Sequence, residues 1–332
     1  MHTAWRASAR CTSNRWKPAF LAAFCKGIPL SFANFFYNLN AQEIEIAAPA
    51  FLFDPEFEAQ SASESAYLRR TGLRRYSTNS GTAAGTTLED AQVHALMELI
   101  ERDALSIELL ATVFSSNPRP LRRISHETLT DDLMELVGLA ESETGGIVTI
   151  WSITSDTRIP AILVRLTDPS DMNYGYFGSG ASIYIGHAIE RALTEAVQGF
   201  HIYTAEHPRP CFSDIKKLKH LSPYRRCLLE YGRFEYQGGE QNVSLSMQIK
   251  EYSDHPMLPV KKQIEVAINA LKKAEIPVYG RVLFSHDIHV AQMYSPTLER
   301  FFLASAGILV VPGKRGRTRM LPANQTEMSR NF

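Results

Sequence analysis

YSTNSGTAAGTTLEDAQVHALMELIER, residues 76–102, decides the fold, and GSGASIYIGHAIERALTEAVQ, residues 178–198, repeats its layout. Each stretch begins with a run of small residues, mainly Gly, Ser, Ala and Thr, which predicts a turn. Apolar residues at helical spacing follow each run and predict a helix. Two turn–helix motifs of the same kind indicate an approximate internal pair. Each helix start would offer backbone N–H groups to an anion.

Side chains with oxygen ligands occur at matching places in the two predicted helices. Glu98 and Glu101 are three residues apart, as are Glu195 and Gln198, so each pair projects from one helix face. Most of their neighbours are apolar, and burying an unpaired carboxylate costs several kcal/mol. A cation bound with a polyphosphate would satisfy these carboxylates, and an arginine of the same helix would also do so. The residues alone leave both interpretations open.

The two motifs resemble the signatures of the YcaO family. NSGTAAGTTLEDA and ALMELIERDA are similar to N-G-x-A-A-G-x-T-x-E-E-A and E-L-I-E-R-D-A, and the second motif is similar to G-x-G-A-H followed by A-x-x-R-A-L-T-E-A-x-Q-S-R. The resemblance covers residues 50–315. Members of this family bind ATP and Mg²⁺ without a P-loop, and the chain has no G-x-x-x-x-G-K-[ST] sequence. The resemblance therefore implies ATP and Mg²⁺ at a non-P-loop site.

The resemblance also implies which residues form that site. In the family, the acidic pair of the first motif and the Glu and Gln of the second belong to the nucleotide–magnesium site. Arg281, in a predicted strand at 277–285, is a candidate phosphate contact, although an ion pair at the edge of the core would explain it equally well. The expected nucleotide-binding residues are Ser80, Glu98, Glu101, Glu195, Gln198 and Arg281, and the expected metal ligands are Glu98, Glu101 and Glu195. No residue is assigned a catalytic role.

Three regions depart from the family pattern. Ser182 stands where many relatives have His, and Gly199-Phe200 stands where relatives often have Ser-Arg. The family's cyclodehydratases often end in a Pro-rich tail, whereas residues 316–332 contain no Pro-x-Pro-x-Pro sequence. These departures bear on the reaction and leave the expected ATP site in place.

Composition favours an ordinary enzyme over a nucleic-acid or membrane protein. The chain has 332 residues with 35 Lys+Arg and 35 Asp+Glu, whereas a general nucleic-acid binder needs a basic surplus. The apolar run at residues 19–36 is interrupted by Lys26 and Pro29, and is too short and broken to span a membrane. The 4 cysteines form no C-x-x-C pair. We expect a cytoplasmic protein with no nucleic-acid or membrane partner.

The expected fold class is α/β (α+β), with mixed sheets covered by helices around the two motifs. A short divergent N-terminal segment at 1–49 would precede a YcaO-like domain at 50–315 and a C-terminal tail at 316–332. The patterns predict helices at 88–110, 128–140, 188–203 and 260–273, and strands at 147–152 and 161–166. Thr87 is the predicted N-cap of the first helix.

The resemblance implies an ATP-dependent enzyme of the cyclodehydratase type, as found in azole- and azoline-forming pathways. It would activate backbone amides of a ribosomal precursor peptide by O-phosphorylation, so that Cys, Ser or Thr side chains close azoline rings. Backbone thioamidation and a non-catalytic nucleotide-binding subunit are the two alternatives. Expected partners are the precursor peptide and a leader-binding protein, and a homodimer is compatible with the sequence.

Overall fold

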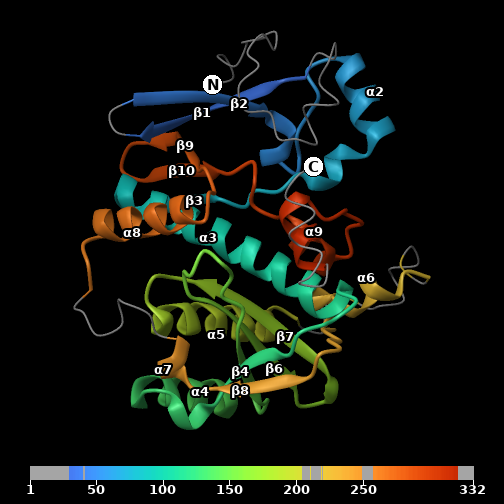
Figure 1. The fold of residues 1–332 in the computed structure, drawn as a ribbon, viewed down its shortest axis with the longest axis vertical. Coiled ribbons are helices and arrows are strands. Elements are labelled where there is room, and N and C mark those ends of the chain that lie inside the picture. Colours follow the sequence, from blue (N-terminus) through green and yellow to red (C-terminus); the bar gives the residue numbers. More distant parts are fainter. Residues whose placement is uncertain are drawn as a thin grey trace. The chain divides into compact units, whose positions relative to one another are not determined.

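The chain folds into two compact units, both discontinuous in sequence. The computed structural model describes residues 30–39, 42–203, 210, 218, 220–248 and 257–320. The described residues up to Ala95 form the first unit together with Pro277–Thr297, and those of Leu96–Ile276 form the second together with the residues from Leu298 on. Figure 1 labels the elements of both. Parts of the expected segments 1–49 and 316–332 lie outside the described residues.

The first unit contains an antiparallel sheet built from distant parts of the chain. Its strands are β1 (Phe32–Leu39), β2 (Gln42–Pro49), β3 (Thr82–Gly85), β9 (Tyr279–Ser285) and β10 (His289–Tyr294), in the order β2-β1-β9-β10-β3. β1 and β2 form a hairpin in continuous register, with Phe32 opposite Pro49 and Leu39 opposite Gln42. Because β9 and β10 occupy the centre, they connect this hairpin to β3.

An aromatic cluster forms the core of the first unit. The rings of Phe35, Phe53 and Tyr294 have centroids 4.8, 5.4 and 5.0 Å apart. Short helices surround this core: η1 (Ala50–Phe53), α2 (Ala62–Thr71) and η2 (Leu73–Tyr76). α2 begins at Ser61, whose hydroxyl accepts a hydrogen bond from the N–H of Glu64 at 3.1 Å, as an N-cap residue does.

Helix α3 (Leu88–Leu109) belongs to both units. Its N-cap is Thr87, as predicted, because the Thr87 hydroxyl accepts a hydrogen bond from the N–H of Asp90 at 3.1 Å. The boundary between the units falls inside the helix, between Ala95 and Leu96. α3 then continues as a π-helix, η3 (Leu110–Phe114).

The second unit contains a five-stranded sheet covered by two helices on one face. The strands are β4 (Leu121–Ile124), β5 (Val148–Ser152), β6 (Ala161–Asp168), β7 (Asp171–Ala181) and β8 (Glu240–Val243), in the order β7-β6-β5-β4-β8. Neighbouring strands are antiparallel except β4 and β8. The helices are α4 (Asp131–Thr144) and α5 (Ile185–Ile202), whose apolar residues join those of the strands in one buried core.

Two glycines allow α5 to pack very closely against β7. A Cβ atom at Gly178 would lie 2.1 Å from the carbonyl oxygen of Ala192, and one at Gly180 would lie 2.4 Å from that of Ala188. No side chain fits at either position without moving the backbone of the helix. The small residues of the second motif therefore set the distance between this strand and the helix that follows it.

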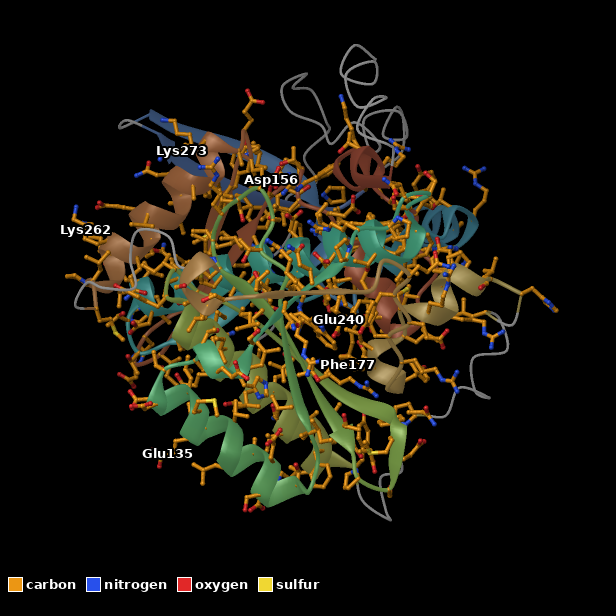
Figure 2. All side chains as sticks on the ribbon, turned by 60° about the horizontal axis from the view of Figure 1, so that its bottom comes forward. Glu135, Asp156, Phe177, Glu240, Lys262 and Lys273 are labelled. Atoms are coloured by element: carbon orange, nitrogen blue, oxygen red, sulfur yellow. The ribbon has the colours of Figure 1, made fainter. Side chains whose placement is uncertain are left out.

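Shorter elements complete the described residues. They are η4 (His126–Thr128), α6 (Ser222–Arg226), η7 (Leu229–Tyr231), α7 (Leu245–Gln248), α8 (Val260–Lys273), η8 (Phe301–Ala306) and α9 (Lys314–Met320). Figure 2 shows the side chains, with Glu135 of α4 and both Lys262 and Lys273 of α8 exposed, as expected for the polar faces of amphipathic helices. No helix in the described part of the chain has the length and apolar character needed to cross a bilayer.

The structure confirms the mixed α/β class and all four predicted helices, but it corrects one detail. Ser80 and Gly81 form a turn, but the small residues nearest each helix are strand residues, Thr82–Gly85 of β3 and residues 178–181 of β7, and residues 86–87 and 182–184 separate these strands from the helices. They are extended because small residues allow a strand to lie against a helix. β1 and β2 pair within the same sheet as β9 and β10, and the expected boundaries at 49 and 315 stay predictions.

Candidate functional site

Two acidic side chains meet at one serine in the second unit. Glu101 comes from α3 and Glu195 from α5, and Ser179 lies in β7 between them. The Ser179 hydroxyl donates a hydrogen bond to Glu101 Oε1 at 2.7 Å, and its backbone N–H donates one to Glu195 Oε2 at 2.5 Å. The structure therefore brings together one carboxylate from each sequence motif.

Burial and like charge act together on this pair. Glu101 is 3% exposed. Burial raises the pKa of Glu195, the nearby charge of Glu101 raises it further, and the positive charge of Arg102 partly opposes both. Two carboxylates in such surroundings favour a bound cation, because a cation would offset both their desolvation and their mutual repulsion.

Two arginines place positive charge beside the carboxylate of Glu101. Arg102 Nε and Arg191 Nη2 each lie 4.0 Å from a carboxylate oxygen of Glu101. Burial alone would lower the pKa of Arg102, but the surrounding carboxylates, Glu101 foremost, raise it on balance. The Nε atoms of Arg102 and Arg191 are buried and have no hydrogen-bond partner among the described residues. Buried N–H donors without partners fit an anion that completes the site.

This donor set fits Mg²⁺ bound together with phosphates better than a metal held by protein alone. Among the described residues, no group of three or more His, Cys, Asp or Glu side chains could hold a metal ion. The expected three-carboxylate set of Glu98, Glu101 and Glu195 therefore does not form a closed cage. Mg²⁺ commonly uses one or two carboxylates together with phosphate oxygens and water, and Glu101 and Glu195 can supply those two.

The remaining residues of the two motifs lie at the margin of this pair. Glu98 is one turn before Arg102 on α3, with its carboxylate 3.9 Å from Arg102 Nε and its side chain 24% exposed. Gln198 is one turn after Glu195 on α5 and is exposed. Both can reach a ligand larger than a metal ion, since neither is buried in the core.

The other two expected nucleotide-binding residues belong to the first unit. Ser80 is buried there, and its hydroxyl lies 2.8 Å from that of Thr78. Arg281 donates two hydrogen bonds to Gln292 Oε1, at 2.8 and 2.5 Å. Its guanidinium lies 4.8 Å from the ring centre of Phe35. Burial lowers the pKa of Arg281. An amide and an aromatic ring thus hold Arg281 in the first unit, and no carboxylate among the described residues forms the ion pair that we considered.

A salt bridge anchors the C-terminal helix next to the site. Asp103, which follows Arg102 in α3, is fully buried, and Arg315 of α9 donates to it at 2.9 Å. Glu299 accepts hydrogen bonds from the N–H groups of Gly313 at 3.0 Å and Gly316 at 2.8 Å. α9 is thereby fixed to the same stretch of α3 that carries the acidic site.

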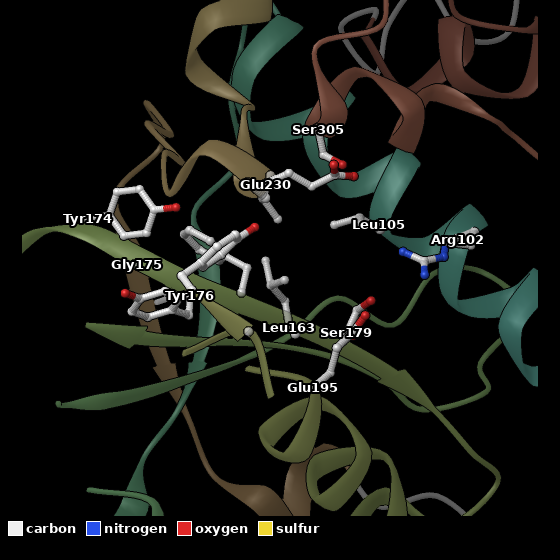
Figure 3. Close-up of a pocket in the computed structure, with 15 residues that line it drawn as sticks. Arg102, Leu105, Leu163, Tyr174, Gly175, Tyr176, Ser179, Glu195, Glu230 and Ser305 are labelled. Atoms are coloured by element: carbon white, nitrogen blue, oxygen red, sulfur yellow. Dashed lines mark hydrogen bonds between the residues drawn. The ribbon is translucent and has the colours of Figure 1, made fainter. Parts of the chain in front are cut away.

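A cavity of about 320 Å³ opens beside the acidic pair, within the second unit. Figure 3 shows Arg102 and Glu195 at one end and Tyr174 at the other, with Glu230 along its wall. Leu163 contributes an apolar floor. Charged groups at one end and apolar and aromatic groups at the other are typical of a pocket for an organic ligand.

The two motifs indicated the carboxylates but not most of the residues around them. Ser179 was one small residue in a supposed turn, and Tyr174 and Glu230 carried no signal. The alternation in G-S-G could have identified Ser179, because in a strand a serine between two glycines faces away from the helix that the glycines contact. Nothing in the local sequence places Glu230 near Arg102, since the two are far apart in the chain.

Comparison with known proteins shows the family to which the chain belongs. A family model described as YcaO cyclodehydratase, ATP- and Mg²⁺-binding, matches residues 19–299. The match covers most of the sequence, and the chain belongs to the YcaO family. The expectation drawn from the two motifs is therefore confirmed, together with the expected cofactors of the family, ATP and Mg²⁺.

Solved structures share the fold. YcaO from Methanopyrus kandleri bound with AMPPCP and Mg²⁺ has a TM-score of 0.59 and 19% identity, covering 90% of this chain and 72% of that one. A heterocyclase in complex with substrate and cofactor has a TM-score of 0.58 and 17% identity, covering 82% of this chain and 34% of its own length. The E. coli microcin synthetase McbBCD complex has a TM-score of 0.52 and 17% identity, covering 82% of this chain and 65% of that one. This chain thus spans about a third of the heterocyclase.

Proposed function

We propose that this chain activates peptide backbone amides with ATP and so drives azoline-type cyclodehydration in a ribosomal precursor peptide. The side chain of a Cys, Ser or Thr attacks the carbon of the preceding amide. ATP supplies a phosphoryl group to the former amide oxygen, which then leaves as phosphate, so that the net change in the peptide is loss of one water. Family membership and the site in the second unit support this function.

The protein contributes charge and position, and needs no nucleophile of its own. Glu101 and Glu195 would hold Mg²⁺, which offsets phosphate charge and aligns the transfer. Arg102 and Arg191 would donate to phosphate oxygens through guanidinium groups that now have an unsatisfied Nε. Ser179 fixes both carboxylates. Ser80, Gln198 and Arg281 remain proposed nucleotide contacts, and Glu98 a proposed third acidic contact.

One observation carries the proposal: two carboxylates from separate motifs converge on Ser179, beside two arginines whose buried Nε atoms have no hydrogen-bond partner among the described residues. Such a cluster is unfavourable for stability when it stands alone, because burial of like charges and unpaired donors is expensive. It becomes favourable when a metal-bound polyphosphate fills it.

The first experiment measures nucleotide binding and turnover separately. Binding of a non-hydrolysable ATP analogue should require Mg²⁺ and disappear in Glu195→Gln. ATP hydrolysis should then rise when a Cys-containing precursor peptide is added. Glu135→Gln, an exposed position on α4, is the matched control and should behave as wild type. Mg²⁺-independent binding, or equal binding by both variants, would show that the site lies elsewhere.

The product distinguishes the alternatives. Cyclodehydration removes one water from the peptide, whereas thioamidation replaces an amide oxygen by sulfur and needs a sulfur donor. Mass spectrometry of the peptide separates these two outcomes. A non-catalytic subunit would bind Mg²⁺–ATP and leave the peptide unchanged under every condition. Gly199-Phe200, in place of the frequent Ser-Arg, favours this alternative because the second residue offers no charge to a phosphate.

We further propose that a leader-binding protein delivers the peptide. Selection of one peptide among many requires a second contact that raises its local concentration at the site. The E. coli structure that shares this fold is a multi-protein synthetase complex. The purified chain should hydrolyse ATP slowly with peptide, and the partner should raise the rate strongly. Efficient, leader-selective modification by the chain alone would refute this dependence. The cytoplasmic location and a homodimer stay predictions.

A further inference from the structure

β7 has an open edge inside the cavity beside the acidic pair. Among the described strands it lies at the end of its sheet, with β6 on one side only. Backbone groups of a strand alternate between its two edges, so residues 175, 177 and 179 direct their N–H and C=O groups away from β6. An edge of this kind can accept a further extended chain.

The outward N–H groups on either side of Phe177 already donate hydrogen bonds within the protein. Gly175 donates to the carbonyl of Gly232 at 3.1 Å, and Ser179 donates to Glu195 at 2.5 Å. No described residue accepts a hydrogen bond from the N–H of Phe177. The segment ending at Gly232 thus covers the edge up to Gly175, and α5 covers it from Ser179, which leaves one residue open between them.

The opening at Phe177 faces the cavity. Gly175, Phe177 and Ser179 all line it. Tyr174 lies at one end and Arg102 with Glu195 at the other, as Figure 3 shows. A strand advances about 3.3 Å per residue, so the site at Ser179 lies roughly 7 Å along the edge from Phe177. A ligand that begins at Phe177 reaches the charged end within two residues.

We propose that the open edge of β7 at Phe177 binds the core of the substrate peptide as a short added strand. This inference rests on the proposed function and names how that site takes its substrate. One peptide residue pairs with Phe177 through two backbone hydrogen bonds, one donated by Phe177 and one accepted by it. The amide about two residues further along the peptide then lies beside Ser179, where the acidic pair would hold the nucleotide.

An extended peptide fits this edge better than other ligands do. The opening offers one donor and one acceptor at the spacing of a backbone, and a peptide presents the matching pair at every second residue. Backbone pairing does not depend on side-chain identity. It therefore suits an enzyme that must present several positions of one peptide to the same site, with selectivity supplied by the leader.

Proline at position 177 tests the added strand directly. Phe177→Pro removes the outward N–H but no hydrogen bond to β6, and an edge strand tolerates proline in that orientation. Phe177→Ala removes the same ring and keeps the N–H, so the comparison between the two isolates the backbone donor. Asn173→Pro places proline on an exposed residue of β7 that does not line the cavity, and measures any general effect of proline on the strand.

The probe is Gly-Ala-Gly-Cys-Ala-Gly amide with fluorescein on its N-terminal amine, and binding is measured by fluorescence anisotropy in the presence of Mg²⁺ and an ATP analogue. Phe177→Pro should bind it about tenfold more weakly than Phe177→Ala, which corresponds to about 1.4 kcal/mol. Affinity for the ATP analogue should be equal in the two variants. Equal peptide affinity, or no peptide binding by the wild type, overturns the added strand. A selective loss of nucleotide affinity overturns it too, because the cavity would then hold the nucleotide.

Peptides with single ester bonds provide a second test that needs no variant. An ester in place of an amide removes one N–H of the peptide, so one position of the probe should weaken binding about tenfold and its neighbours should not. A uniform effect along the probe would contradict pairing with a strand. If the wild type shows no Mg²⁺-dependent nucleotide binding, the proposed function is refuted. This measurement does not depend on any of the peptide measurements.

Discussion

The two motifs are alike in sequence and differ in how strand and helix pack. In the second motif, α5 lies along its own strand, and glycine is required at both Gly178 and Gly180. In the first motif, close approach is limited to the helix start, where a Cβ at Gly85 would lie 2.5 Å from the backbone nitrogen of Ala91. Glu195 of the second motif accepts a hydrogen bond from β7, the strand of its own motif. Glu101 of the first motif accepts a hydrogen bond from that same strand and not from β3.

This difference assigns separate tasks to the two motifs. The second motif is a rigid strand–helix pair that fixes Glu195 and Ser179. The first motif supplies a long helix whose later turns carry Glu101, Arg102 and Asp103 into the second unit. Repetition in sequence therefore does not mean repetition of the packing, and variants at equivalent positions should have unequal effects.

The largest expected effect is on the carboxylates that converge on Ser179. Glu101→Gln and Glu195→Gln should each lower ATP turnover by about a hundredfold or more, since each removes a charge that would hold Mg²⁺. Glu98→Gln should lower it less, because the Glu98 side chain is 24% exposed and already lies 3.9 Å from Arg102 Nε. Steady-state ATPase rates measure this, with circular dichroism to confirm the fold. Equal losses of ATP turnover in all three variants would mean that Glu98 matters as much as Glu101 and Glu195.

The next effect separates the two kinds of packing. Gly178→Ala should destabilise the protein by about 3 kcal/mol, because the added methyl group collides with the backbone of α5. Gly85→Ala should destabilise it less, since its clash involves only the first turn of α3 and that turn can shift. Urea unfolding gives both values. A greater loss at Gly85 would reverse the assignment of the rigid pair.

The pKa of Glu195 predicts a pH dependence of stability without nucleotide. Because this pKa is raised in the folded protein, the proton binds the folded state more tightly than the unfolded chain. The stability contributed by protonated Glu195 is therefore present below the ordinary value of 4.5 and is lost as the pH rises through the raised pKa. Glu195→Gln should be increasingly more stable than wild type above pH 4.5. If the difference in stability between Glu195→Gln and wild type does not change with pH, the pKa of Glu195 is not raised in the folded protein.

The smallest expected effect is a gain at a glycine with open surroundings. Gly138 lies inside α4, and a Cβ there would meet no atom within 4 Å. Gly138→Ala should stabilise the protein by about 0.5–1 kcal/mol, since alanine favours a helix more than glycine does. Thermal unfolding should show a small rise in midpoint. A loss of stability would indicate that α4 is covered by another molecule at this point.

Local patterns predicted the local structure well. The helical spacing of apolar residues gave α3, α4, α5 and α8, and the side chain of Thr87 indicated where α3 begins. The acidic residues of the motifs were found because carboxylates in apolar helices need a partner. These signals are present within about twenty consecutive residues, which is the range over which periodicity can be recognised.

Features that depend on distant residues were not predictable in the same way. Extended small residues before a helix look like a turn, and only the packing of α5 shows that they form a strand. The hydrogen bonds of Arg281 to Gln292 were not foreseen, because the register of β9 and β10 sets them, and the phosphate contact of Arg281 stays a prediction. The cavity combines residues from β7, α3 and η7, and no local pattern encodes their meeting.

The order of strands in the first unit has a consequence for synthesis on the ribosome. β9 and β10 lie at the centre of that sheet, yet they are translated after almost all of the second unit. The hairpin of β1 and β2 and the strand β3 emerge early and must wait for their neighbours. Pairing over such separations is slow, and waiting strands expose edges that can aggregate. We expect nascent chains halted at residue 276 to depend on chaperones, whereas chains extended beyond Tyr294 can complete the sheet.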